Sequence, residues 1–360
     1  MALEDGSVFR GRTIGKIGTV GGEICFNTGM TGYQEVYTDP SYYGQILVNA
    51  SAHIGIYGVH ELEIESKTPK IAGLVVNRFS DFYSRNTAYD SLQNYLVAHN
   101  IVGISDIDTR QLVRHIRDKG AMNGIISSEI LDPVVLRFEL QKTPSMKGLE
   151  LASKVTTHEP YFVGSESAKY RVAAMDYGIK AKILASLVER DCYVKVFPAK
   201  TPFEELKKWN PDGYFLSNGP GDPESMGYAV ESIKKMLNDD KPIFGICLGH
   251  QLLALACGID TYKMHHGHRG LNHPVKNLAT GKSEITTQNH GFAVNGEAVK
   301  RAKNVRVTHI NLNDGTVEGI EVIGKKAFSV QYHPESCPGP HDSRYLFDQF
   351  IALMSQNNHQ

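Results

Sequence analysis

After residue 170 the sequence alternates between apolar runs and amphipathic stretches, and this pattern constrains the fold more than any other feature. Short apolar runs typical of buried strands occupy residues 172–175, 193–197, 214–216 and 243–246. Stretches with helical spacing separate them, and the first places Ile183, Leu184 and Leu187 on one face. This alternation predicts an α/β fold with a doubly wound, mainly parallel sheet.

The length of 360 residues suits two domains. The first part of the chain mixes short apolar runs with many Gly, Tyr, Asn and Thr residues, which predicts a separate mixed α/β domain over residues 1–149. Residues 150–168 lose periodicity and gather Ser, Thr, Glu and Pro, as linkers do. We therefore expect the doubly wound domain to cover residues 169–360.

The first domain contains several recognisable local patterns. Strands are expected at 46–48 and 71–76, and helices at 90–99 and 108–119. The outer face of the last helix carries Arg110, Arg114 and Arg117. This face is either a solvated surface or a docking surface for an acidic partner, and the sequence leaves both interpretations open.

In the second domain, a helix start is expected at Thr201. Thr201 occupies the cap position, Pro202 the first turn, and Glu204 completes a capping box.

The composition excludes several classes of protein. With 38 basic and 39 acidic residues, the formal net charge of −1 does not suit a general binder of nucleic acid or anionic membranes. No apolar run approaches the ~18 residues that span a bilayer, and the N-terminus has acids where a signal peptide has bases. Five cysteines without a CxxC pair disfavour a disulfide framework. We expect a cytoplasmic protein.

The segment 245–249 has the pattern G-x-C-x-G between an apolar strand and a helix. This is the elbow that presents the nucleophile of many hydrolases at the carboxyl end of a sheet. The glycines allow the sharp turn, and the helix N-terminus stabilises a thiolate on Cys247. The backbone N–H of Leu248 would then point at the oxyanion formed when the thiolate attacks a carbonyl.

A cysteine nucleophile needs a base and an orienting group, and the tripeptide 333–335 supplies both. His333 would transfer the proton, and Glu335 would hold the imidazole in one tautomer. A third motif, the turn 217–223, follows another strand and exposes backbone N–H groups at Gly219 and Gly221. Its spacing does not match a phosphate-binding loop, so we expect no nucleotide site there.

No metal site is expected in this chain. His265, His266, His268 and His273 are close in sequence, but alternate residues of a strand point to opposite faces and no carboxylate or cysteine stands at ligand spacing. Cys25, Cys192 and Cys257 occupy apolar contexts that favour packing. Cys337 follows the tripeptide closely, and we expect it to be either a bystander or a second thiol near the site.

The motifs of the second half resemble those of the class I (triad) glutamine amidotransferases. These motifs are FGICLGHQ at 244–251, SNGPGDP at 217–223 and HPE at 333–335. Further segments are similar to the small subunit of carbamoyl phosphate synthetase: FNTGMTGYQE at 26–35, TDPSY at 38–42, DIDTR at 106–110 and QNHGF at 288–292.

The resemblance implies that Cys247 attacks the amide of L-glutamine to form a thioester, with His333 and Glu335 completing the triad. It also implies that eight residues bind glutamine: Ser41, Gly219, Gly221, Leu248, Gln251, Asn289, Gly291 and Phe292. Ser41 would bring the first domain into the active site of the second.

The resemblance further implies a partner, the synthetase large subunit, in a heterodimer or a higher oligomer of it. Ammonia would pass to that subunit, which would hold ATP and Mg and form carbamoyl phosphate from bicarbonate for arginine and pyrimidine synthesis. No cofactor is expected in this chain. Two alternatives rank lower: a catalytically silent scaffold, which would lack the nucleophile or the base, and a stand-alone cysteine hydrolase, which would leave the first domain unexplained.

Overall fold

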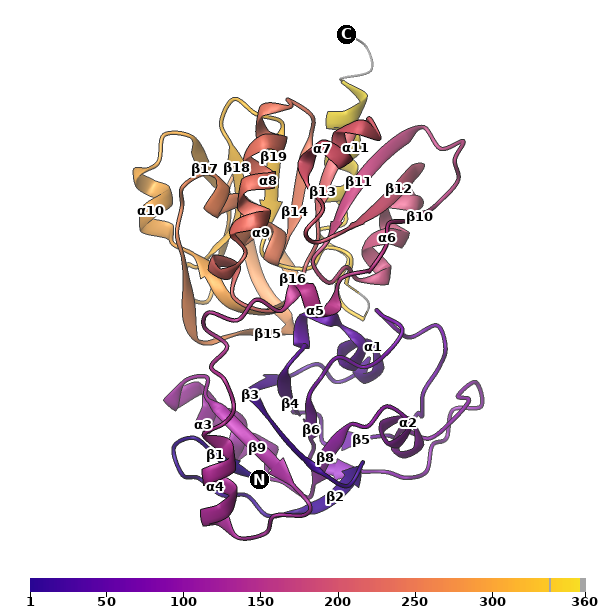
Figure 1. The fold of residues 1–360 in the computed structure, drawn as a ribbon, viewed down its shortest axis with the longest axis vertical. Helices are drawn as coiled ribbons and strands as arrows, with labels where there is room; N and C mark the ends of the chain where they lie inside the picture. Colours follow the sequence, from indigo (N-terminus) through magenta and orange to yellow (C-terminus); the bar gives the residue numbers. More distant parts are fainter. Residues whose placement is uncertain (337, 357–360) are drawn as a thin grey trace. The chain divides into compact units, whose positions relative to one another are not determined.

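The computed structural model describes residues 1–336 and 338–356, which form two compact units (Figure 1). The first unit comprises Met1–Met146 together with His265–Arg269. The second comprises Lys147–Met264 and Gly270–Gln360. Each unit has hydrophobic cores of its own, and the expectation of an α/β chain is confirmed.

The first unit is built on a seven-stranded sheet in the order β1-β9-β3-β4-β6-β8-β2. In that order, the strands are Ala2–Leu3, Asn123–Ser127, Thr19–Asn27, Gln45–Asn49, Gly73–Val75, Val102–Ser105 and Arg12–Gly15. The four strands β3, β4, β6 and β8 are parallel, and the outer pairs are antiparallel. A small sheet pairs β5 (His53–Ile54) with β7 (Arg78–Phe79).

The helices of the first unit are α1 (Tyr33–Thr38), η1 (Pro40–Tyr42), α2 (Leu92–Ala98), α3 (Thr109–Lys119) and α4 (Pro133–Leu140). The two predicted helices are confirmed as α2 and α3. In α3, Asp108 accepts a hydrogen bond from the Gln111 backbone N–H at 2.9 Å, and Gly120 ends the helix with a φ of +97°. All three arginines of its outer face are exposed.

The second unit contains a ten-stranded sheet in the order β10-β12-β11-β13-β14-β19-β18-β17-β15-β16. In that order, the strands are Tyr161–Val163, Cys192–Pro198, Tyr170–Asp176, Gly213–Leu216, Ile243–Ile246, Ala327–Val330, Val317–Val322, Val305–Asn311, Thr261–Asn277 and Ser283–Val294. Its five-stranded centre, from β12 to β19, is parallel throughout. The remaining pairs described beside it are antiparallel.

Helices cover both faces of this sheet (Figure 1). They are α5 (Ala152–Val155), α6 (Ala181–Val188), α7 (Phe203–Lys208), η2 (Pro223–Ser225), α8 (Gly227–Asn238), α9 (Leu248–Ala256), α10 (Gly296–Arg301) and α11 (Tyr345–Ser355). Val172 and Ala174 of β11 face a core shared with α6 and α11, whereas Ala173 and Met175 face a core shared with α8 and α9. This alternation confirms the doubly wound sheet.

Two local features differ from the expectations. The range 150–168, expected to be a linker, contains α5 and the edge strand β10, whose Phe162 ring stacks on Tyr193 at 5.2 Å. Elements of three or four residues are too short to produce a readable periodicity. The capping box at Thr201 is wrong, because Pro202 adopts an extended backbone and α7 starts only at Phe203, without a side-chain cap.

The stretch His265–Arg269 of β15 packs with the first unit. The backbone N–H of Ala121 donates to the carbonyl of His265 at 2.6 Å, and the Phe26 and His266 rings meet edge to face at 6.3 Å. A segment of the second half of the chain is thereby part of the first unit.

Searching the described residues reveals no helix long and apolar enough to cross a membrane. The four cysteines within them are free thiols, with Cys25 and Cys192 buried as expected and Cys257 half-buried. Cys337 lies outside the described residues.

Candidate active site

Cys247 stands on the predicted sharp turn between β14 and α9. Its φ of +54° and ψ of −103° are unusual for a residue with a side chain, and α9 begins at the next residue, Leu248. Both flanking glycines are required: a Cβ on Gly245 would lie 2.8 Å from the carbonyl oxygen of Gly249, and one on Gly249 would lie 2.2 Å from that of Leu216. The predicted elbow is therefore confirmed.

The thiol of Cys247 is nearly enclosed, with 3% of the residue exposed. The backbone N–H of Cys247 donates to the carbonyl of Val330 at 2.9 Å, and its Sγ–H donates to the carbonyl of Asn289 at 3.6 Å. Because Leu248 is the first residue of α9, no preceding turn of that helix supplies a carbonyl for its N–H. The site thus places a thiol beside a backbone donor and the positive end of a helix dipole.

His333 and Glu335 lie directly after β19, which neighbours β14 in the sheet. The His333 Nδ1 and the Glu335 Oε1 are 2.8 Å apart, and the His333 backbone N–H donates to the carbonyl of Thr287 at 3.0 Å. With Nδ1–H donating to the carboxylate, Nε2 is the nitrogen left for chemistry. Both side chains are buried.

A residue that the sequence did not reveal completes this group. Lys180, between β11 and α6, donates from Nζ to the Glu335 Oε1 at 2.9 Å, and both side chains are buried. Lys180 stands 155 positions before Glu335 in the chain, so no spacing pattern connects them. One carboxylate oxygen therefore receives two donors, and this holds Glu335 in place.

The charges of this group shift both pKa values. Burial by itself would lower the pKa of His333, but the negative charge of Glu335 outweighs it, and contact with the Cys247 thiol adds to the rise. The pKa of Glu335 is lowered, because attraction to Lys180 and His333 exceeds the opposing effect of burial. The imidazole is therefore biased toward its protonated form, which a group that donates a proton to a leaving amine requires.

The turn after β13 lies beside the elbow, as expected from neighbouring parallel strands. The Gly249 backbone N–H donates to the carbonyl of Ser217 at 3.0 Å and thereby ties the two loops together. A Cβ on Gly219 would lie 2.1 Å from the carbonyl oxygen of Tyr177, and Gly221 has a φ of +95°. Only glycine fits either position without strain, so the shape of this turn depends on both glycines.

Of the other residues predicted to bind glutamine, Gln251 belongs to α9, and Asn289, Gly291 and Phe292 belong to β16, whose Asn289 carbonyl contacts the thiol. The side-chain amide of Gln251 donates both hydrogens, to the carbonyl of Phe292 at 2.8 Å and to the Oε1 of Gln331 at 3.0 Å. Its own carbonyl oxygen is therefore the group that Gln251 presents. Gln331 was missed from the sequence, although it stands only two residues before His333, in the segment that follows β19.

Ser41 is placed in the first unit, in η1, where its backbone N–H donates to the Asp39 Oδ1 at 2.9 Å. The other predicted site residues all belong to the second unit. The expectation that Ser41 contacts glutamine stays a prediction.

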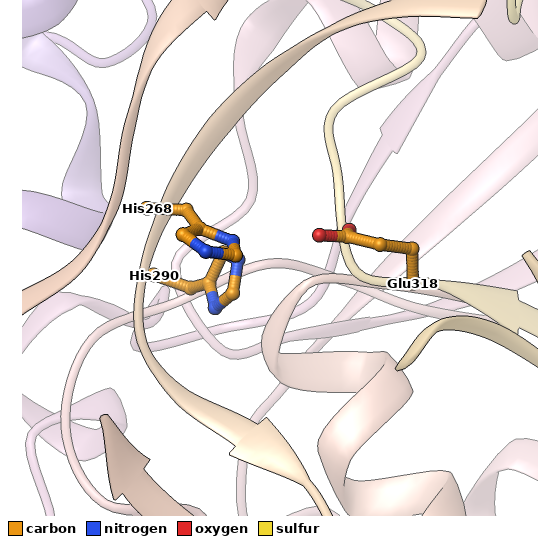
Figure 2. A group of neighbouring side chains, drawn as sticks. All are labelled: His268, His290 and Glu318. Atoms are coloured by element: carbon orange, nitrogen blue, oxygen red, sulfur yellow. The ribbon is translucent and has the colours of Figure 1, made fainter. Parts of the chain in front are cut away.

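Figure 2 shows three side chains with ligand chemistry, His268, His290 and Glu318, from β15, β16 and β18. The His290 Nδ1 lies 2.7 Å from the carbonyl oxygen of Phe292, and Nε2 lies 2.8 Å from the Oε1 of Gln288. The Glu318 Oε1 accepts a hydrogen bond from Asn311 at 2.9 Å. A metal would have to replace one of the His290 hydrogen bonds, so these residues do not fit a ready-made site.

Replacing Glu335 by Gln is expected to lower the pKa of His333, because the carboxylate charge raises it. The imidazolium exists only below that pKa, so the basic limb of the pH profile of kcat moves to lower pH. We expect kcat at neutral pH to fall about tenfold. Glutamate release measured across the pH range checks this, with the exposed Glu159→Gln as control; an unmoved basic limb contradicts it.

Two family descriptions match the chain: "Glutamine amidotransferase class-I" over residues 173–353, and "Carbamoyl-phosphate synthase small chain, CPSase domain" over residues 1–126. The carbamoyl phosphate synthase small chain of Syntrophotalea carbinolica is 50% identical, covering 99% of this chain and 98% of the relative. The small chain of a Synechococcus strain is 49% identical, covering 98% of this chain and 93% of the relative. The small chain of Chlorobaculum tepidum is 49% identical, covering 99% of this chain and 97% of the relative.

These similarities extend over both units and include the segments that carry the cysteine elbow, the turn after β13 and the tripeptide 333–335. The resemblance noted from the sequence motifs is confirmed. The chain belongs to the family of carbamoyl phosphate synthase small chains.

Proposed function

We propose that this chain is the glutaminase subunit of a glutamine-hydrolysing carbamoyl phosphate synthetase. The observation that carries the proposal is the buried group formed by Cys247, His333 and Glu335 at the carboxyl ends of β14 and β19. A nucleophile on a strained elbow, a base and an orienting carboxylate are the parts that acyl transfer needs.

In the proposed reaction, the Cys247 thiolate adds to the amide carbon of L-glutamine. The N–H groups of Leu248 and Gly219 would hold the oxyanion of the tetrahedral intermediate. His333 gives its Nε2 proton to the departing nitrogen, the C–N bond breaks, and ammonia and a γ-glutamyl thioester result. His333 then takes a proton from water, whose oxygen attacks the thioester and releases glutamate and the thiol.

Substrate binding would use the groups that the fold presents around the thiol. The carbonyl oxygen of Gln251 suits a donor such as the α-ammonium group of glutamine, and the Gln251 amide is hydrogen-bonded to the backbone of β16 at Phe292. Ser41 is proposed to contribute from the first unit.

We further propose that this chain works together with a partner subunit. Relatives are named small chains, and we propose a large subunit that binds ATP and Mg and combines ammonia with bicarbonate. Ammonia is mostly protonated in neutral water and is then no nucleophile, so direct transfer to the partner preserves its reactivity. We place the complex in the cytoplasm, where the free thiols stay reduced.

The test is the rate of glutamate release from L-glutamine by this chain, alone and with a carbamoyl phosphate synthetase large subunit, ATP and bicarbonate. We expect a slow basal rate that rises at least about tenfold in the complete mixture. A rate that ignores the partner would retain the hydrolase chemistry and contradict the synthetase role. No glutamate under either condition would contradict both.

A further inference from the structure

The segment that joins the two units is hydrogen-bonded directly to the turn that carries Gly219 and Gly221. Residues 148–150, here called the strap, lie within the second unit. The Gly148 backbone N–H donates to the Asp222 Oδ2 at 2.8 Å, and the Asp222 backbone N–H donates to the carbonyl of Leu149 at 2.9 Å. Glu150 and Gly221 form an isolated antiparallel bridge. The strap thus pairs with the turn through one antiparallel bridge and two flanking hydrogen bonds.

The contact between strap and turn leaves no spare space. A Cβ on Gly221 would lie 2.7 Å from the carbonyl oxygen of Leu149 and 3.0 Å from the backbone nitrogen of Leu151. Asp222 is buried, and its second oxygen, Oδ1, accepts from the Glu224 backbone N–H at 3.0 Å. A shift of the strap must therefore move Gly221 and Asp222 with it.

The far end of the strap is fixed to the body of the second unit. The Glu150 Oε1 accepts hydrogen bonds from the Ser153 backbone N–H at 2.9 Å and from the Tyr228 hydroxyl on α8 at 2.8 Å. Burial by itself would raise the pKa of Glu150, but hydrogen bonds outweigh it and lower the pKa, first the one from the Ser153 hydroxyl and then those from the Ser153 backbone and Tyr228. Glu150 is thus held as a carboxylate, so the strap is anchored at neutral pH.

The near end of the strap follows closely on an anchor in the first unit. The Asn123 side chain, at the start of β9, donates to the carbonyls of Thr143 at 3.0 Å and Pro144 at 3.2 Å. Only residues 145–147 separate Pro144 from Gly148, the first strap residue bound by Asp222. So short a connection transmits displacement, whereas a long flexible linker would absorb it.

We propose that the strap, acting through Asp222, positions the 219–221 turn for the oxyanion and couples this turn to displacements of the first unit. Asp222 is a positioning residue here, because it holds the backbone of the turn and does not touch the substrate. The inference rests on the proposed function: the displacement in question is the one caused by docking of the synthetase partner. The bonds that change are hydrogen bonds between strap and turn, and no covalent step is involved.

The first test is Asp222→Asn, which preserves size but can place an NH₂ group against the Gly148 N–H. Misplacing an oxyanion donor acts on the transition state, so kcat for glutamate release by the chain alone is expected to fall about tenfold while KM changes less than about threefold. The melting temperature, measured in parallel, identifies a purely structural effect. An unchanged kcat, or a loss in kcat explained by unfolding, overturns the positioning role.

The second test lengthens the connection without touching the site. About four glycines inserted between Ser145 and Met146 add slack, and the same insertion at Gly281 in the β15–β16 hairpin, where the Cβ position is open, is the control. We expect the variant with the insertion at 145 to keep the basal rate of glutamate release. Its stimulation by the large subunit should fall at least about fivefold, while size-exclusion chromatography verifies that the complex still forms. If the large subunit stimulates the variant with the insertion at 145 as strongly as the wild type, the proposed coupling is wrong.

The two proposals fail in different ways. If the wild-type chain releases no glutamate, the proposed function fails. If the wild type is active and stimulated but the insertion changes nothing, only the coupling fails. If the wild type is active without stimulation, the coupling falls together with the partner role, and the kcat of Asp222→Asn still decides the positioning role.

Discussion

Replacing Cys247 by Ser is expected to abolish glutamate release, with kcat falling at least about 10³-fold. A hydroxyl gives up its proton far less readily than a thiol, and His333, whose pKa is raised toward the protonated form, is poorly suited to remove it. Serine is close to cysteine in size, so the elbow itself should fold. Steady-state glutamate release and the melting temperature check this.

The same variant separates the two halves of the proposed reaction. In complex with the large subunit, Cys247→Ser should lose glutamine-dependent synthesis but keep synthesis from added ammonia, because only the supply of ammonia is blocked. The matched control is Cys257→Ser at the end of α9, where burial raises the thiol pKa to about 11 and no catalytic partner is present among the contacts described. Survival of glutamine use in Cys247→Ser would refute the nucleophile assignment.

His333→Asn is expected to reduce kcat for glutamine by about 10²- to 10⁴-fold. An asparagine amide can still donate to Glu335, but it cannot take up a proton and return it. The loss concerns the step in which ammonia leaves, because an amide nitrogen departs only after protonation. Single-turnover measurements of glutamate and thioester formation check this.

A substrate with a better leaving group sharpens this prediction. The γ-methyl ester of glutamate releases an alcohol, which depends less on a general acid than an amine does, so its loss of kcat in His333→Asn should be smaller than that of glutamine. The exposed His158→Asn serves as control. Equal losses for amide and ester would contradict a role for His333 as the acid.

Local sequence signals were sufficient for the central part of the site. The glycines flanking Cys247 are needed within the turn itself, and the strand and helix on either side have clear periodicity. The tripeptide 333–335 places base and carboxylate within one short segment, so their hydrogen bond is also local. The doubly wound sheet followed from the strand–helix alternation, because each strand and each helix also has a pattern that can be read within a short stretch of sequence.

Other parts of the site depend on contacts between distant segments. Lys180 reaches Glu335 only because β11 and β19 belong to one sheet, and Gln331 reaches Gln251 across the elbow. The strap lies at the edge of a range expected to be linker, and its role comes from hydrogen bonds to a turn more than 70 residues away. The histidine-rich stretch of β15 similarly belongs to the first unit through contacts such as that between Phe26 and His266, without a periodic signal in the sequence.

The sequence by itself thus determined the fold class, the sharp turn at Cys247, the pairing of His333 with Glu335 and the family, because each depends on residues close together in the chain. Only the tertiary structure decided which groups hold the Glu335 carboxylate, which side-chain amide orients Gln251, and which segment contacts the turn at Gly221 and Asp222. The physical reason is that hydrogen bonds and burial depend on distance in space, and the folded sheet brings together residues whose separation along the chain leaves no pattern to read.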